Sequence, residues 1–386
     1  MSGQGNLPES FVASSQPSQS LYDILQPVVT TTESLSVDPK ARAVIADIHA
    51  DYDALVASLQ AAVVIAQQEG LLIYELILLG DYIDRGVESF EVINSIVKLR
   101  KKIDSIENLD FKLTTLWGNH EACLFEAMCA PYSLGAVAGW LVQGGLQTLE
   151  SLQQLRDVSI NSDFFEALES RLLPDKLKQS RHNVARYLQD NKAAEDYLRI
   201  YLSELARHPI IRSFFNSLEL YAFSGKDFYV HGGLTAEFII NNNIATDSWF
   251  DLSKKRFQAA VSEAWIGDFD DFKTFTAAPR SRGGSIEDIP GPLWTSSVDL
   301  PQDKFGRLVL ADLLAIYGAK RMVVGHSVVN ELSLVDLTAS TKLPLEVLFL
   351  DTGISYVYRT NYSRQCLVTG DGFNYAISQD NSPFSF

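Results

Sequence analysis

Short apolar runs alternate with amphipathic segments in the first third of the chain. Apolar runs at residues 43–46, 76–79 and 111–117 have the length of buried strands, and residues 53–68 and 88–101 between them carry apolar positions at helical spacing. This order predicts a β-α-β-α-β unit whose strands run parallel. Polar residues follow each strand directly, and in open α/β sheets such strand ends carry the binding sites.

Residues 120–217 form a long block with helical spacing and no clear strand pattern, with a turn expected at Gly144 and Gly145. Strand patterns return in a hairpin at 218–230, and the Gly, Pro and Asp content of residues 266–291 predicts a long loop. The further predicted elements are a helix at 308–317 and strands at 322–324, 332–337, 345–350 and 356–359. The whole pattern predicts an α/β protein with a helical insertion at 121–217.

The first 40 residues differ in amino-acid composition from the rest of the chain. They are rich in Ser, Gln, Thr and Pro and contain no Lys or Arg before Lys40. We expect a flexible leader at residues 1–40, with one helical turn near residues 21–25, ahead of a single domain at 41–380. The basic start and apolar stretch of a secretory signal are not found here.

Charge and cysteine content narrow the classes of function. The 386 residues include 48 acidic and 32 basic side chains, a formal charge of −16, which argues against nucleic acid or an anionic membrane surface as the main partner. The longest apolar stretch, residues 71–79, is too short to span a bilayer. The three cysteines suit a reducing compartment. None of the three is followed by Arg six positions later, which excludes the active-site loop of cysteine-dependent phosphatases. From the short apolar stretch and the cysteine content we expect a soluble cytoplasmic protein.

Five polar motifs follow predicted strands in the order of the chain. A single motif of this kind is commonly a surface turn, whereas five in order at strand ends indicate a site. Four of the six histidines belong to these motifs, while His182 and His208 lie in the helical block and are expected to be structural. The motifs are Asp47-Ile48-His49, Gly80 to Gly86, Gly118 to Glu121, His231-Gly232-Gly233 and Gly325-His326-Ser327.

Asp, His and Asn in these motifs are ligand types that divalent metals prefer. They predict two ions, one held by Asp47, His49 and Asp81 and a second that shares the Asp81 carboxylate. The other ligands of the second ion would be Asn119, His231 and His326. Two ions about 3.5–4 Å apart would polarise a phosphoryl oxygen and yield a bound hydroxide near neutral pH.

Three further side chains suit phosphate chemistry. Arg85 can grip phosphoryl oxygens with its planar fork. His120 follows Asn119 and cannot easily point at the same ion, so we expect it to donate a proton to the leaving oxygen. Asp84 is placed to orient the His120 imidazole.

The motifs resemble the signature of the calcineurin-like metallophosphoesterases, and more narrowly that of the phosphoprotein phosphatases. The resemblance covers about residues 45–355, and its most specific parts are Gly80-Asp81-x-x-Asp84-Arg85-Gly86 and Gly118-Asn119-His120-Glu121. It implies a four-layer α-β-β-α sandwich with a two-metal site, with Mn²⁺ as the first choice and Fe or Zn as alternatives. It also implies that Asp84 and His120 act together as the acid pair.

Two other segments resemble bacterial members of the family and diadenosine tetraphosphate hydrolases. They are Trp140-x-x-x-Gly144-Gly145-x-x-Thr148 and Asp351-Thr352-Gly353. The first motif departs from the family pattern, because Ala46 and Ala50 replace its flanking glycines. Positive φ is costly for alanine, so we expect this loop to avoid it.

The family's second phosphate-binding arginine is not found where it is expected. Residues 295–297, directly after the Trp294 segment, are Thr-Ser-Ser. Arg280 and Arg282 are our candidates for substrate binding in its place, because a loop at 279–285 could bring them over the cleft. Arg307 is a third candidate with less reach.

The sequence therefore predicts a metal-dependent phosphoprotein phosphatase acting on phosphoserine and phosphothreonine, with phosphotyrosine left open. One alternative is a hydrolase of dinucleoside polyphosphates. Another alternative is a catalytically silent scaffold that binds phosphopeptides. The complete set of candidate metal ligands argues against this alternative. We expect a phosphoprotein partner, no nucleic acid and no insertion into membranes. The polar leader and large insertion would also suit a bacterial effector translocated into a host cell without a signal peptide.

Overall fold

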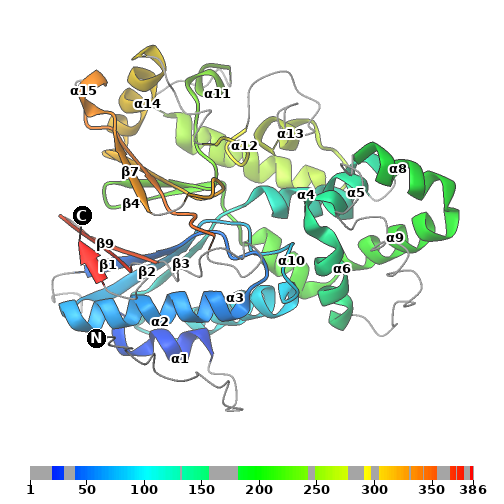
Figure 1. Ribbon diagram of the computed structural model, residues 1–386, viewed down its shortest axis with the longest axis horizontal. Helices are drawn as coiled ribbons and strands as arrows, with labels where there is room; N and C mark the ends of the chain where they lie inside the picture. The colour runs from blue at the N-terminus through cyan, green and yellow to red at the C-terminus, as the bar shows by residue number, and fades with distance from the viewer. Residues whose placement is uncertain are drawn as a thin grey trace, which may run out of the picture.

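Two mixed sheets face each other, and helices cover the outer face of each sheet (Figure 1). The predicted α/β class and the four-layer sandwich are thereby confirmed. The structure is a computed structural model. It describes residues 20–29, 40–130, 133–155, 181–241, 248–276, 291–296, 304–329, 332–341, 343–353, 366–370, 372–377 and 383–385.

The first sheet has the strand order β11-β10-β9-β1-β2-β3. Its β1 (Lys40–Ile45), β2 (Leu72–Leu78) and β3 (Lys112–Thr115) pair in parallel, as predicted. The connecting helices α2 (Tyr52–Glu69) and α3 (Ser89–Asp104) lie on the outer face, below the sheet in Figure 1. The carboxyl ends of these three strands therefore meet at one edge.

Three C-terminal strands that the sequence pattern did not reveal extend this sheet. They are β9 (Leu367–Gly370), β10 (Phe373–Ile377) and β11 (Pro383–Ser385). β9 pairs antiparallel with β1, so the end of the chain closes beside its first strand. The pairing joins residues more than 300 positions apart, and local patterns carry no signal for it.

The second sheet has the order β4-β5-β6-β8-β7. β4 (Tyr221–Ser224) and β5 (Asp227–Val230) form the expected hairpin. β6 (Arg321–Val324) lies between β5 and β8 (Glu346–Phe349) and is parallel to both. β7 (Ser333–Asp336) closes the edge antiparallel to β8, and the strand expected at 356–359 lies outside the described residues.

A helical subdomain stands beside the sandwich, on the right in Figure 1. Its helices are α4 (Asn119–Cys129), α5 (Leu134–Trp140), α6 (Leu146–Ser151), α8 (Arg181–Asp190), α9 (Lys192–Leu205) and α10 (Pro209–Asn216). The turn expected at Gly144 and Gly145 is a π-helical turn, Leu141–Gly145, that joins α5 to α6, with φ of +107° at Gly144. In the described part of the insertion, residues 121–130, 133–155 and 181–217, the predicted helical structure is present.

The remaining helices lie above the second sheet and beside it in Figure 1. They are α11 (Ala236–Asn241), α12 (Trp249–Ala264), α13 (Asp270–Thr276), α14 (Lys304–Ile316) and the short α15 (Thr338–Thr341). α13 falls in the predicted loop 266–291, and for those residues that prediction was wrong. Phe272 stacks on Phe257 at 5.9 Å and packs edge-on against Trp117. Apolar burial therefore outweighed the local Asp and Gly content.

The two sheets are held together by an apolar layer and, at the beginnings of the strands, by polar bonds. The Arg321 guanidinium binds both carboxylate oxygens of Asp227 at 2.8 Å and reaches Thr369 of the first sheet at 3.0 Å. A second bond between the sheets joins the Ser224 hydroxyl of β4, which donates, to the Glu75 carboxylate of β2. The apolar layer consists of Val44, Ala46, Ile77, Leu79, Leu116, Ala222, Tyr229, Val323, Leu348, Leu350 and Leu367.

Part of the expected leader belongs to the folded domain. The helical turn predicted near residues 21–25 is α1 (Leu21–Leu25), capped by Ser20 and followed by a 3₁₀ turn. Leu21, Ile24 and Leu25 are buried where α1 packs on α2 and α3, so residues 20–29 are not a free leader. Among the described helices, none is long and apolar enough to cross a membrane.

Candidate active site

Two loops at the strand ends are held in strained backbone conformations. After β1, His49 and Ala50 have φ of +46° and +55°; after β2, Asp81, Asp84 and Arg85 have φ between +51° and +69°. The left-handed region costs roughly 1–2 kcal/mol for such residues, and strain of this kind gathers at functional sites. The expectation that the first loop avoids positive φ was wrong.

Hydrogen bonds between the two loops explain the strain. The backbone N–H groups of His49 and Ala50 donate to the carbonyl oxygens of Asp81 and Tyr82, each at 2.8 Å. The Ala50 carbonyl in turn accepts from the N–H of Glu88 at 3.0 Å. These bonds lock the loops against each other and outweigh the conformational preference of alanine.

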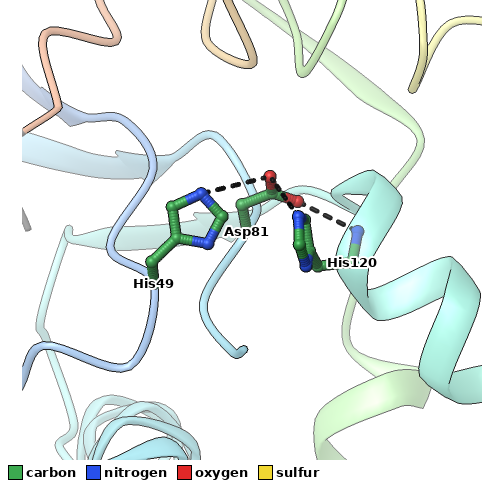
Figure 2. Close-up of side chains that lie close together, drawn as sticks. All are labelled: His49, Asp81 and His120. Atoms are coloured by element: carbon green, nitrogen blue, oxygen red, sulfur yellow. Dashed lines mark hydrogen bonds and ion pairs between the residues drawn. The ribbon is translucent and has the colours of Figure 1, made fainter. Parts of the chain in front are cut away.

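Asp81 lies at the centre of the site, buried between two groups of histidines. Its Oδ2 is 3.7 Å from Nε2 of His49 and 3.9 Å from Nε2 of His120. Figure 2 shows Asp81 between these two rings. Its Oδ1 is 3.4 Å from Nε2 of His231. His49, Asp81 and His120 form one potential metal cluster, and Asp81, His231 and His326 form another. The shared carboxylate has the position expected of a bridging ligand.

The surroundings of Asn119 fit a cation. Its Oδ1 lies 3.0 Å from Nε2 of His231 and 2.8 Å from Nδ1 of His326. His231 donates its Nδ1 proton to the Leu79 carbonyl at 2.9 Å, and burial lowers its pKa, so Nε2 carries a lone pair. In this orientation the lone pairs of Asn119, His231 and Asp81 converge, an arrangement that a positive ion would stabilise.

The same orientation recurs at His49. Its Nδ1 lies 3.2 Å from the Ile83 carbonyl, so Nε2 faces Asp81. Burial, aided by Arg85, lowers the His49 pKa well below its ordinary value. A backbone acceptor that fixes one ring nitrogen and frees the other is the usual support of a metal-ligating histidine.

Two more buried acids, Asp47 and Asp351, lie beside Asp81. The Asp47 carboxylate accepts the backbone N–H of His326 at 3.1 and 3.2 Å. Burial, with Asp351 and Asp81 nearby, raises the pKa of Asp47 well above its ordinary value. Burial likewise raises the pKa of Asp351 to about 7. Among the described residues, Oδ2 of Asp351 has no hydrogen-bond partner, so this oxygen is available to a further donor or a cation.

Asp351 was noted in the sequence only as part of a resemblance. Its signal was present, because it follows the strand predicted at 345–350 just as the candidate ligands follow theirs. Asp47 needs a qualification, since its carboxylate is turned to the His326 backbone and it belongs to neither ligand cluster.

The candidate acid pair is formed and fully buried. Nδ1 of His120 lies 2.8 Å from Oδ2 of Asp84. Arg85 spans the cavity, since its two terminal nitrogens donate to Nε2 of His49 and Nε2 of His120, each at 3.1 Å. The guanidinium therefore lies directly beside both the ligand cluster and the expected proton donor.

Glu121 joins the two central motifs. Its carboxylate oxygens accept the backbone N–H groups of Asp81, Tyr82 and Gly118 at 2.8, 2.9 and 3.0 Å. Gly118 permits this approach, because a Cβ there would lie 2.2 Å from both the backbone nitrogen and Oδ1 of Asp81. The sequence showed Glu121 within a motif and indicated no role for it. In the structure its carboxylate joins the backbone of the Gly80–Gly86 motif to that of the Gly118–Glu121 motif.

A cavity of about 270 Å³ opens over the cluster, close to the lower end of the size range of ligand pockets, about 300–1,000 Å³. Gln143 and Trp294 line it without having been predicted, and the Trp294 ring meets His326 edge-on at 5.9 Å. Arg280 and Arg282 lie outside the described residues. The cavity is lined by His49, Asp81, Arg85, Asn119, Gln143, Trp294 and His326, and Arg307 in α14 is not among these.

A two-sheet sandwich with His, Asp and Asn side chains clustered at its strand ends defines a metallophosphoesterase, a class that uses divalent metal ions. The chain belongs to the calcineurin-like phosphoesterase family, whose family model matches residues 42–330. It is thereby a hydrolase of phosphate esters. Comparison with curated proteins finds no match.

Solved structures with the same fold include a cold-active protein tyrosine phosphatase of a psychrophilic Shewanella species. It is 15% identical, with a TM-score of 0.51 over 92% of this chain and 85% of that one. A point mutant of a cold-active protein tyrosine phosphatase is 16% identical, with a TM-score of 0.51 over 90% and 80%. A protein serine/threonine phosphatase from Saccharomyces cerevisiae is 12% identical over 95% of this chain and 86% of that one, with a TM-score of 0.37.

Proposed function

We propose that this protein is a metal-dependent phosphoprotein phosphatase that hydrolyses phosphoserine and phosphothreonine, with phosphotyrosine as a further substrate to be tested. One arrangement supports this most strongly: Arg85 lines the same cavity as the Asp81 cluster, and its guanidinium bonds to the His120 ring of the buried Asp84–His120 pair. A phosphate-binding group and candidate ligands thus line a single space, and the candidate proton donor lies directly behind Arg85 and Asp81. A scaffold that only binds phosphopeptides has no use for the proton donor.

Divalent ions, when bound, supply Lewis acidity toward phosphoryl oxygens and lower the pKa of a water that can attack phosphorus. His49 and Asp81 would hold one ion, and Asp47 would join them by turning its carboxylate from the His326 backbone. Asp81, Asn119, His231 and His326 would hold the other. Carboxylate, imidazole and amide oxygen donors suit Mn²⁺, and we propose it as the first metal to test, with Fe and Zn as alternatives.

The chain's own residues divide the remaining work. Arg85 exchanges its bonds to His49 and His120 for bonds to two phosphoryl oxygens, and this attraction grows as negative charge develops in the transition state. His120, relieved of Arg85, presents Nε2 to the leaving oxygen and gives it a proton. Asp84 stabilises the imidazolium that this role requires and keeps Nε2 of the ring directed toward Arg85 and Asp81.

A panel of phosphoserine, phosphothreonine and phosphotyrosine peptides, together with diadenosine tetraphosphate, tests the proposal with added Mn²⁺. We expect release of inorganic phosphate from the phosphopeptides, with kcat/KM at least tenfold higher than on the dinucleotide. Turnover of diadenosine tetraphosphate alone would assign the protein to the polyphosphate hydrolases. Binding of phosphopeptides without turnover would support the scaffold.

A further inference from the structure

Two side chains of the helical insertion, Trp140 and Thr148, form hydrogen bonds to Asp84 of the site. Trp140, at the end of α5, donates its indole N–H to Oδ1 of Asp84 at 3.0 Å, and Thr148 in α6 donates its hydroxyl to the same oxygen at 2.7 Å. The other carboxylate oxygen, Oδ2, faces Nδ1 of His120. All four side chains are fully buried. A carboxylate with two donors on one oxygen cannot rotate away from its partner on the other.

Thr148 also fixes the backbone of Asp84. The Asp84 N–H donates to Oγ1 of Thr148 at 2.8 Å, and the Ser89 hydroxyl lies 2.8 Å from the same atom. Because the single proton of Thr148 is directed to Asp84, Ser89 donates to Thr148. Asp84 is thus bound through side chain and backbone while its φ is +67°, a conformation that persists only where surrounding bonds impose it.

The π-helical turn between α5 and α6 fixes the next residue. The carbonyl of Gly144 accepts the backbone N–H of Arg85 at 3.1 Å. A Cβ on Gly144 would lie 2.8 Å from the nitrogen and Cγ of Arg85, and φ at Gly144 is +107°. Only glycine lets the turn approach Arg85 this closely.

We propose that Trp140 and Thr148 are positioning residues of the proton-donating pair. They hold Asp84 so that His120 keeps its Nε2 directed toward Arg85 and Asp81, and they act through Asp84 rather than on substrate or ion. This rests on the proposed function for the role of His120. It goes beyond that function because it makes α5 and α6 of the insertion necessary for proton transfer.

The test compares two leaving groups. Thr148→Val should lower kcat on phenyl phosphate by roughly tenfold or more, the usual worth of a hydrogen bond to a charged group, with KM unchanged. The loss should be much smaller on p-nitrophenyl phosphate, whose leaving group departs without a proton. Trp140→Phe should show the same split, and Thr148→Ser should restore activity. Equal losses on both substrates would overturn the proposal.

A double-mutant cycle sharpens this result. In a His120→Asn background, Thr148→Val should cause no further loss, because the positioned group is already gone. Losses that simply add would show that Thr148 acts by another route. Thr115→Val is the matched control: Thr115 is equally buried, donates to the Ser217 carbonyl at 3.1 Å and lies outside the site. It should leave both substrates unaffected.

A readout without turnover separates this inference from the proposed function. The imidazole N–H signal of His120 in NMR spectra, identified by its absence from His120→Asn, reports the bond to Asp84 directly. It should shift or broaden in Thr148→Val and stay unchanged in Thr115→Val. An unchanged signal in Thr148→Val would overturn the inference, whether or not the protein hydrolyses phosphomonoesters.

Discussion

Replacing Gly118 by alanine should disable the site through a single methyl group. The new Cβ would lie 2.2 Å from the nitrogen and Oδ1 of Asp81 and 2.5 Å from a carboxylate oxygen of Glu121. Ordinary contacts of a Cβ begin at 3.4 Å, so the loop after β2 must move by about 1 Å. That loop carries the central carboxylate, and no flexible side-chain end is available to absorb the shift.

The size of the effect follows from this displacement. A misplacement of about 1 Å in a catalytic constellation can cost about 100-fold, and overpacking a rigid interior costs about 1–3 kcal/mol. Gly118 has φ of −102°, so the substitution adds no backbone strain of its own. We expect Gly118→Ala to lower kcat/KM about 100-fold and the free energy of unfolding by about 1–3 kcal/mol.

Gly139→Ala provides the matched control. Gly139 lies within α5, where a Cβ would meet only the flexible Arg181 side chain at 3.4 Å. Alanine is favoured over glycine in helices by about 1 kcal/mol, so this variant should be as active as wild type and at least as stable. Urea unfolding, metal content per chain and steady-state kinetics are the measurements. Wild-type metal content and kcat/KM in Gly118→Ala would refute the reasoning.

Four further predictions follow from the site. Chelation should abolish activity and Mn²⁺ restore it, with two ions per chain by metal analysis; active enzyme holding at most one ion would rule out the two-ion site. His120→Asn should keep its metal and lose roughly 10²–10⁴ in kcat on phenyl phosphate, and an equal loss on p-nitrophenyl phosphate would count against the acid role. Arg85→Ala should lower kcat/KM by about 10² or more, and if Arg280→Ala and Arg282→Ala keep wild-type values, neither arginine replaces the missing one. Alkylation at pH 7 should leave activity unchanged, because burial raises the pKa of all three cysteine thiols.

The position of the site could be predicted because it depends on strand polarity. Asp81 and Asn119 follow parallel neighbouring strands, and His231 and His326 follow two parallel strands of the other sheet. Parallel strands end at the same edge, so residues after each strand must meet. The chemical roles of these residues stay predictions.

Contacts between distant segments could not be predicted. Ala50 adopts positive φ because of bonds to a loop 30 residues away, and residue type alone pointed the other way. Trp140 and Thr148 stood out only by resemblance, because their bonds to Asp84 join residues 56 and 64 positions apart. The local sequence of α13 is typical of a loop, and the helix depends on the contact between Phe272 and Trp117, which are distant in sequence.

The candidate ligands come from both sheets, and this has a consequence for heat resistance. Asp81 belongs to the first sheet, while His231 and His326 belong to the second, so an ion held by all three joins the layers at their open edge. A ligand that binds only the docked arrangement stabilises it by mass action, by about 2.7 kcal/mol at 100 times its dissociation constant. Arg321 already ties the sheets at the beginnings of the strands. The melting temperature should therefore rise with free metal concentration. The ion would join the two sheets at the carboxyl ends of the strands, the edge opposite the Arg321–Asp227 salt bridge, and chelation would remove this connection.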